Sequence, residues 1–156
     1  MLTEQHWLNI CQNVTNMAMP ILKIKFNTRL RSEIVSSLFE MEAQKYYESC
    51  GLKVKSASND QEPDLFFEEE KTPVEIKVTK EKKSVTWMGN NVSKRISPFI
   101  LITWMEQEDN LVFTVHKTFL TPDDWTKSKQ NYNASFLKLS EIKQIETLIN
   151  HKSFFV

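Results

Sequence analysis

Glycine is scarce in this chain: its 156 residues include two glycines, Gly51 and Gly89, and five prolines. Loops that wrap the phosphates of a nucleotide need several glycines close together, because only glycine lets the backbone approach a phosphate closely and adopt a positive φ. The sequence contains neither a P-loop nor a GxGxxG fingerprint. The sequence therefore argues against both a P-loop nucleotide-binding fold and a dinucleotide-binding fold.

Cysteine and histidine are also rare. Cys11 and Cys50 form no CxxC pair, and the three scattered histidines leave no spacing typical of a structural zinc site. Unpaired thiols are usual in a reducing compartment, so we expect a cytoplasmic protein. The sequence shows no signal peptide and no apolar run long enough to cross a membrane, so we expect no membrane partner.

The net charge is zero, with 20 basic and 20 acidic residues, which argues against a general nucleic-acid coating protein. The charges are unevenly distributed along the chain. Residues 56–70 carry six acidic side chains and no base, whereas residues 71–95 carry seven bases and two acids. An acidic cluster beside a basic one suits a metal site flanked by phosphate contacts, although a run of lysines is equally typical of a solvated surface.

The composition, 40% apolar and 26% charged, is typical of one globular domain spanning residues 1–156. Apolar periodicity divides it into an N-terminal helix (3–18), a core (about 28–117) and a C-terminal helical part (121–150). Within these parts we predict a helix over 28–50, strands at 52–57, 74–78, 98–105 and 111–116, a capped helical turn at 121–125 and a closing helix at 139–150.

Capping residues set the ends of the first two predicted helices. Thr3 can cap the first helix, and Pro20 is predicted to end it. Asn27 or Thr28 can cap the second helix, and Gly51 follows as its C-terminal stop.

Residues 63–78 are typical of a strand hairpin with an acidic tip. Successive side chains of a strand point to opposite faces, so the valines and isoleucine of the returning strand share one face and can be buried. Glu75 and Lys77 share the other face, which is unusual for a purely structural hairpin. Asp64, at the start of the first strand, can converge with Glu75 on a hard divalent cation, because such cations prefer oxygen ligands.

The pattern formed by Pro63-Asp64, Glu75 eleven positions later and Lys77 resembles the PD-(D/E)XK nuclease superfamily, which includes type II restriction endonucleases and Holliday-junction resolvases. The predicted order of helix, Gly51, strand, Pro-Asp strand and Glu-X-Lys strand is similar to the superfamily core, over about residues 30–105. The resemblance implies an α/β fold with three α/β/α layers and a mixed central sheet, a restriction-endonuclease-like core.

The same resemblance implies the chemistry of the site. Asp64 and Glu75 would bind Mg²⁺ together with the backbone carbonyl of Ile76, and Lys77 would position the attacking water. The metal lowers the pKa of a bound water and offsets negative charge in the transition state. The products expected from the superfamily are a 5′-phosphate and a 3′-hydroxyl.

A glutamate on the first core helix often reaches towards the metal site in this superfamily, and two residues compete for that role. Glu40 stands eleven positions before Gly51, within a run FExxAxxYxExxG that is similar to resolvase-like members. Helical phase instead places Glu42 inside the apolar stripe of the helix. Glu40 shares its face with small residues such as Ser36, which let a helix approach a sheet closely. We predict Glu40 as the catalytic residue and retain Glu42 as the alternative.

Residues 79–97 surround Gly89 with lysines, hydroxyls and amides, groups that contact phosphates and base edges in DNA complexes. The stretch looks similar to the segment that follows the Glu-X-Lys strand in some restriction endonucleases. We expect its lysines to contact phosphates and its asparagines or arginine to read bases. The predicted DNA-binding residues are Lys80, Lys82, Lys83, Asn90, Asn91, Lys94 and Arg95.

These features together predict a Mg²⁺-dependent endonuclease that hydrolyses double-stranded DNA, sequence-specifically and of restriction type. A small enzyme of this kind cuts both strands as a homodimer, with the helix around Trp7 or the tail 154–156 as the interface. One alternative is a structure-specific nuclease or Holliday-junction resolvase, for which we expect a more basic surface. The other is a DNA-binding subunit that keeps the fold without cutting, against which Asp64, Glu75 and Lys77 argue.

Overall fold

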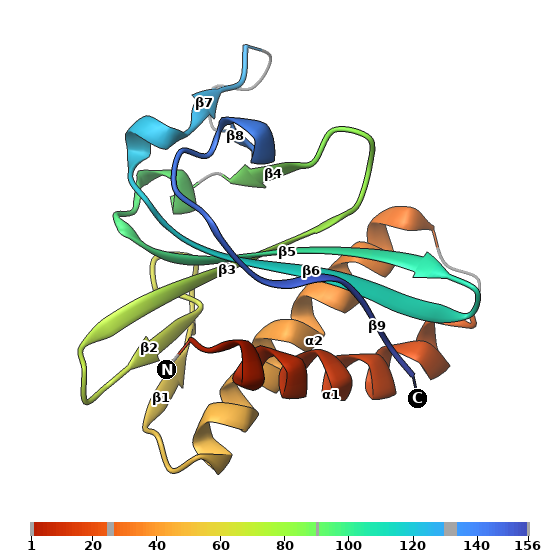
Figure 1. Ribbon diagram of the computed structural model, residues 1–156. Helices are drawn as coiled ribbons and strands as arrows, with labels where there is room; N and C mark the ends of the chain where they lie inside the picture. Colours follow the sequence, from red (N-terminus) through yellow and green to blue (C-terminus); the bar gives the residue numbers. More distant parts are fainter. Residues whose placement is uncertain (1, 25–26, 90, 130–133, 156) are drawn as a thin grey trace.

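The computed structural model describes residues 2–24, 27–89, 91–129 and 134–155 (Figure 1). The helices are α1 (Glu4–Leu22) and α2 (Thr28–Ser49). The strands are β1 (Val54–Ser56), β2 (Leu65–Phe67), β3 (Thr72–Lys80), β4 (Thr86–Gly89), β5 (Ser97–Gln107), β6 (Asn110–Leu120), β7 (Thr126–Lys127), β8 (Ser135–Lys138) and β9 (Glu146–Phe154). Short 3₁₀ helices are η1 (Asn91–Lys94), η2 (Pro122–Asp124) and η3 (Leu139–Glu141).

Both predicted N-terminal helices are confirmed, and their ends follow from capping chemistry. The Thr3 hydroxyl accepts a hydrogen bond from the His6 N–H at 3.4 Å. The Asn27 side-chain oxygen accepts one from the Leu30 N–H at 2.8 Å, which identifies Asn27 as the cap of α2. Gly51 follows α2 with φ +82°, a left-handed conformation that favours glycine and stops the helix.

The prediction that Pro20 ends the first helix is wrong. Pro20 lies inside α1, which continues to Leu22. A proline in a helix removes one backbone hydrogen bond. Met19 and Leu22 beside it are both buried in the core, and the Lys23 N–H still donates to the Met19 carbonyl at 3.2 Å. Apolar burial on this last turn therefore offsets the lost bond.

Six strands form one mixed sheet in the order β1-β2-β3-β5-β6-β9. Its one parallel pair among the described residues is β3 with β5, joined by a crossover that carries β4 and η1. The predicted mixed central sheet is confirmed. The strands β5 and β6 pair in it as an antiparallel hairpin.

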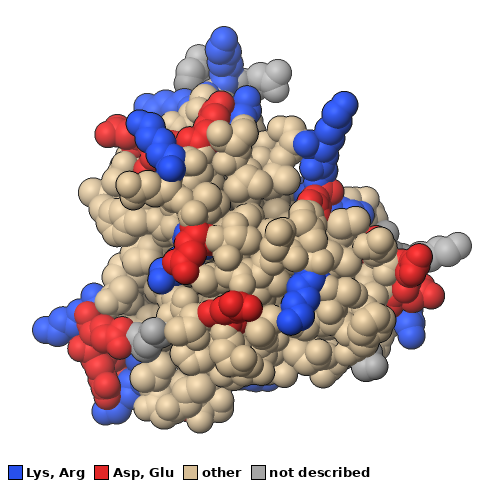
Figure 2. All heavy atoms as spheres, viewed as in Figure 1, with Lys and Arg blue, Asp and Glu red and all other residues tan. Residues whose placement is uncertain are grey.

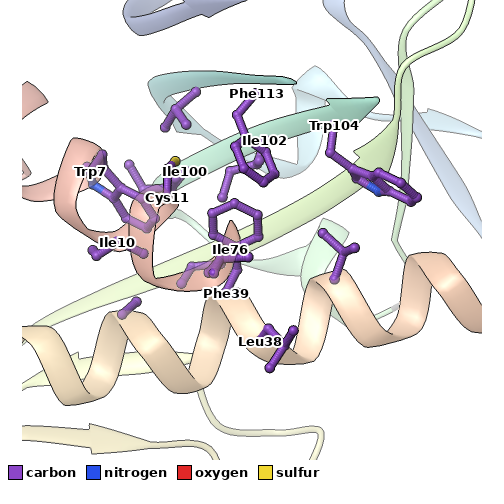
Figure 3. Close-up of a cluster of buried hydrophobic side chains, with 14 of the residues drawn as sticks. Trp7, Ile10, Cys11, Leu38, Phe39, Ile76, Ile100, Ile102, Trp104 and Phe113 are labelled. Carbon is purple, nitrogen blue, oxygen red and sulfur yellow. The ribbon is translucent and has the colours of Figure 1, made fainter. Parts of the chain in front are cut away.

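Both helices cover one face of this sheet (Figure 1). Their apolar side chains pack with alternate residues of the central strands in one core (Figure 3). Trp7 and Ile10 come from α1, Phe39 from α2, Ile76 from β3 and Phe113 from β6, and each is at most 2% exposed. The alternation of β3 thereby turns Glu75 and Lys77 away from the helices.

The opposite face of the sheet differs from the predicted three-layer α/β/α arrangement. It carries a second sheet of three strands, in the order β4-β8-β7, rather than helices (Figure 1). Trp87 and Leu137 of this small sheet pack with Phe99 and Leu101 of β5 in a second, smaller core. The protein is therefore an α/β protein with two helices on one face of a mixed sheet and a small sheet beside the other. Trp87 is 1% exposed and is a packing residue.

The predicted C-terminal helical part, 121–150, is wrong except for its first turn. The capped turn is confirmed as η2, whereas the predicted helix over 139–150 is replaced by η3 and strand β9. β9 pairs with β6 through two register shifts, and the consecutive residues Leu148 and Ile149 are both buried. A bulge inserts an extra residue and turns neighbouring side chains to the same face. The resulting apolar spacing imitates that of a helix.

Candidate functional site

The acidic residues singled out in the sequence meet in one open cleft of about 620 Å³, at the N-terminal end of β2 and alongside β3. Asp64, Glu75, Lys77 and Glu40 all line it, although they come from three separate segments of the chain. The other lining residues are Ser36, Ala57, Ser58, Asn59, Asp60, Glu62, Ile76, Val78, Val92 and Arg95.

Asp64 lies where β2 and β3 separate. Their antiparallel pairing begins at Leu65 with Val74, so Asp64 is one residue outside the ladder. In place of a ladder bond, its Oδ2 accepts a hydrogen bond from the Ile76 N–H at 2.7 Å. This bond fixes the carboxylate beside the backbone of β3, next to Glu75. The fork between the strands thus holds two carboxylates and a stretch of strand backbone together.

Glu75 is 1% exposed, on the face of β3 that points away from the helices. Its Oε1 forms an ion pair with Nη1 of Arg95, which follows η1. The other terminal nitrogen of Arg95 donates to the Asp60 carbonyl at 2.9 Å. A buried carboxylate without a partner is costly, so this guanidinium stabilises the metal-free site.

Glu40 rather than Glu42 faces the cleft. Glu40 and Ser36, one helical turn apart on α2, both line it. Glu42 is 7% exposed and lies 3.7 Å from the Lys45 ammonium, outside the cleft lining. The helical phase therefore correctly indicated that Glu42 is buried, while the spacing to Gly51 indicated which acid reaches the cleft.

Two of these acids, Glu75 and Glu40, have raised pKa values. Burial raises the pKa of Glu75 to about 7; the neighbouring Asp64 carboxylate adds to the rise, and Arg95 opposes it. Burial likewise raises the pKa of Glu40 to about 7, with the negative charges of Asp64 and Glu75 adding to it and Lys77 lowering it. The acids are therefore close enough to disfavour one another's charge, a repulsion that a bound cation would relieve.

The predicted DNA-binding residues divide into separate groups. Lys82, Lys83 and Lys94 are exposed. Lys80 lies outside the cleft lining, with its ammonium 5.3 Å from the centre of the Trp104 ring, on the helix-covered face of β3. Arg95, predicted to read bases, contacts Glu75 and the Asp60 carbonyl in the protein without DNA. Asn90 lies outside the described residues, and of Asn91 only the backbone, at the start of η1, is described.

Sequence reasoning missed the pairing of Arg95 with Glu75. The two residues are twenty positions apart, and the crossover containing β4 and η1 brings them together. Gly89 contributes to this placement, because a Cβ there would lie 2.5 Å from Val92 Cγ1 and 3.1 Å from the Trp125 ring. This tight packing places η1, which Arg95 follows, against the small sheet. The only signal in the sequence was the excess of acids upstream and of bases downstream.

The donor set fits a magnesium ion better than a metal that needs a closed cage. No group of three or more His, Cys, Asp or Glu side chains in the described parts of the chain is arranged to hold a metal by itself. Mg²⁺ commonly uses one or two carboxylates, keeps several waters and takes further oxygens from a substrate phosphate. Asp64, Glu75 and the strand backbone at Ile76 match that requirement, provided that Arg95 leaves the Glu75 carboxylate.

No protein-family model matches the sequence, and no curated protein matches it. Neither helix in the described residues is long and apolar enough to span a membrane. We therefore infer the function from the residues of the cleft.

Proposed function

We propose that the protein is a Mg²⁺-dependent endonuclease that hydrolyses phosphodiester bonds of double-stranded DNA, sequence-specifically and of restriction type. One observation carries the proposal. Asp64, Glu75, Lys77 and Glu40, the four residues that the PD-(D/E)XK resemblance selects, line a single cleft at the fork of β2 and β3. A charged hairpin with a purely structural role gives no reason for a distant helix to add a third acid to the same cleft.

Each residue has a defined part in the proposed reaction. Asp64 and Glu75, with the carbonyl of Ile76, would hold the metal, and Glu40 would contribute a third acid beside it. When bound, the metal supplies an acidified water and charge stabilisation at the phosphate. Lys77 shares the Glu75 face of β3, where its ammonium orients the attacking water and stabilises negative charge. Glu40, with a pKa of about 7, can hold or release a proton near neutral pH.

Exposed basic side chains on the crossover and on the small sheet suit a phosphate backbone. Lys82, Lys83 and Lys94 are exposed on the crossover that borders the cleft. Figure 2 shows further basic side chains, mixed with acidic ones, on the upper part of the molecule where the small sheet lies. Lys127 and Lys138 of β7 and β8 are among the exposed lysines there. Lysine contacts to phosphates supply affinity that depends on salt but not on sequence.

Cutting both strands requires two sites, so we propose that the enzyme acts as a homodimer. Trp7 is 0% exposed and Phe154 is 5% exposed, because both belong to the main core. Neither is available as an interface residue. Phe155, 79% exposed beyond the end of β9, keeps the C-terminal tail as the candidate contact.

The test is a cleavage assay with the purified protein on supercoiled plasmid, linear duplex and a four-way junction, with Mg²⁺ or with EDTA. We expect discrete Mg²⁺-dependent fragments from the duplexes, with 5′-phosphate ends shown by end sequencing. Preferential cutting of the junction would support the resolvase alternative. Binding of duplex without cutting of any substrate would support the non-cutting subunit, the alternative that the Arg95–Glu75 ion pair favours.

A further inference from the structure

Arg95 occupies the position that a metal ion would need at Glu75. Its guanidinium is held at two points, by the Glu75 carboxylate and by the Asp60 carbonyl. The Glu75 side chain is 1% exposed and the Arg95 side chain 21% exposed. The arginine thus reaches into the cleft from its rim and covers the deepest acid.

The charge of the cleft depends on this one side chain. Five acids line the cleft, namely Glu40, Asp60, Glu62, Asp64 and Glu75, against two bases, Lys77 and Arg95. Counted as fully ionised groups, three of the acids remain in excess even while Arg95 is present. Arg95 partly neutralises a site that can accept more positive charge.

A guanidinium binds carboxylates and phosphates with the same forked geometry. Arg95 is therefore able to exchange Glu75 for a phosphate of bound nucleic acid. Its neighbours Lys94 and Ile96 are both exposed, so this part of the cleft rim is accessible to a ligand from solution. Leaving Glu75 without any cation would be costly, so the exchange needs a metal ion to enter at the same time.

We propose that Arg95 is a placeholder cation, which closes the metal site of the free protein and transfers to a DNA phosphate when a divalent ion replaces it at Glu75. The inference rests on the proposed function, because it takes DNA as the source of the phosphate. Its consequence is reciprocal coupling: duplex DNA strengthens metal binding, and metal strengthens DNA binding by the same factor. The protein without DNA would then bind little metal. It would not hydrolyse phosphate esters that fail to displace Arg95 from Glu75.

The experiment measures metal binding directly, by calorimetric titration of Ca²⁺ into full-length protein, with and without a short duplex. Ca²⁺ serves as a probe that occupies oxygen sites. Arg95→Gln removes the placeholder. Arg29→Gln is the matched control, because Arg29 pairs with Glu33 at 3.1 Å on the surface, with its side chain 89% exposed. Thermal unfolding checks that each variant is folded, and Arg95→Lys provides a second variant that keeps the charge but loses the fork.

Without DNA, we expect Arg95→Gln to bind Ca²⁺ about tenfold more tightly than wild type, and Arg95→Lys to fall between them. Duplex should tighten Ca²⁺ binding to wild type about tenfold and leave Arg95→Gln nearly unchanged. Unchanged or weaker Ca²⁺ binding by both Arg95 variants without DNA would overturn the inference, even if the wild-type protein cuts DNA. Tighter binding by Arg95→Gln with no effect of duplex on wild type would support Arg95 as the placeholder and contradict DNA as the source of the phosphate.

Discussion

The raised pKa of Glu75 predicts that the metal-free protein loses stability as the pH rises. Glu75 is 1% exposed, and burial raises its pKa from 4.5 to about 7. Between these values the folded protein binds more protons than the unfolded chain, so the free energy of unfolding falls with increasing pH. The stabilisation is fully present below pH 4.5 and is lost as the pH passes through about 7.

The expected size follows from the shift. At 1.36 kcal/mol per pKa unit, a rise from 4.5 to about 7 corresponds to about 3 kcal/mol. Glu40 acts in the same direction but contributes less, because it is partly exposed and solvent screens its charge. The variant Glu75→Gln resembles the protonated acid at every pH. Its stability relative to wild type should therefore increase by about 3 kcal/mol between pH 4.5 and pH 8.

The assay is urea unfolding in EDTA at several pH values, for wild type, Glu75→Gln and Glu42→Gln. Glu42→Gln leaves Glu40 and Glu75 in place and should follow the wild-type pH dependence. A relative stability of Glu75→Gln that stays constant or decreases as the pH rises would refute the reasoning about this acid.

Three further predictions concern the individual residues of the cleft and its rim. Lys77→Ala should lower the single-turnover cleavage rate by about 10²–10⁴-fold with metal affinity largely kept, and a near-normal rate would move the role of Lys77 elsewhere. Glu40→Ala should lose far more activity than Glu42→Ala, because only Glu40 lines the cleft, and equal losses would argue against this assignment. Removing Lys82, Lys83 or Lys94 should weaken binding about equally on all duplexes and lower the salt slope by about one counterion, as measured by titration at two salt concentrations; unchanged slopes would place the DNA surface elsewhere.

Local patterns predicted the parts of the fold that depend on local forces. The helix caps and the alternation along β3 are decided by neighbouring residues, and the structure has them as expected. The interval between Asp64 and Glu75 correctly indicated adjacent strands, because a hairpin is the shortest route between them. These local patterns were sufficient to predict that Asp64, Glu75 and Lys77 lie close together.

Features that depend on tertiary context were not predictable in this way. The closing helix was wrong because a bulge in β9 buries Leu148 and Ile149 side by side. The helical third layer was wrong because the small sheet assembles from β4, β7 and β8, which are distant in sequence. Arg95 reaches Glu75 only through the crossover between parallel strands. In each case, contacts between residues distant in sequence determined the structure, and the local spacing of residues could not predict them.

Single-turnover cleavage of duplex DNA by Asp64→Ala and Glu75→Ala, beside Glu62→Ala, tests the central claim most directly. Glu62 is the matched control because it lines the same cleft, while its carboxylate is bound by Ser58 at 2.8 Å. Both Asp64→Ala and Glu75→Ala should abolish Mg²⁺-dependent cleavage while remaining folded and binding duplex, and Glu62→Ala should cut at close to the wild-type rate. Cleavage retained by both Asp64→Ala and Glu75→Ala would contradict the assignment of a nuclease centre to this cleft.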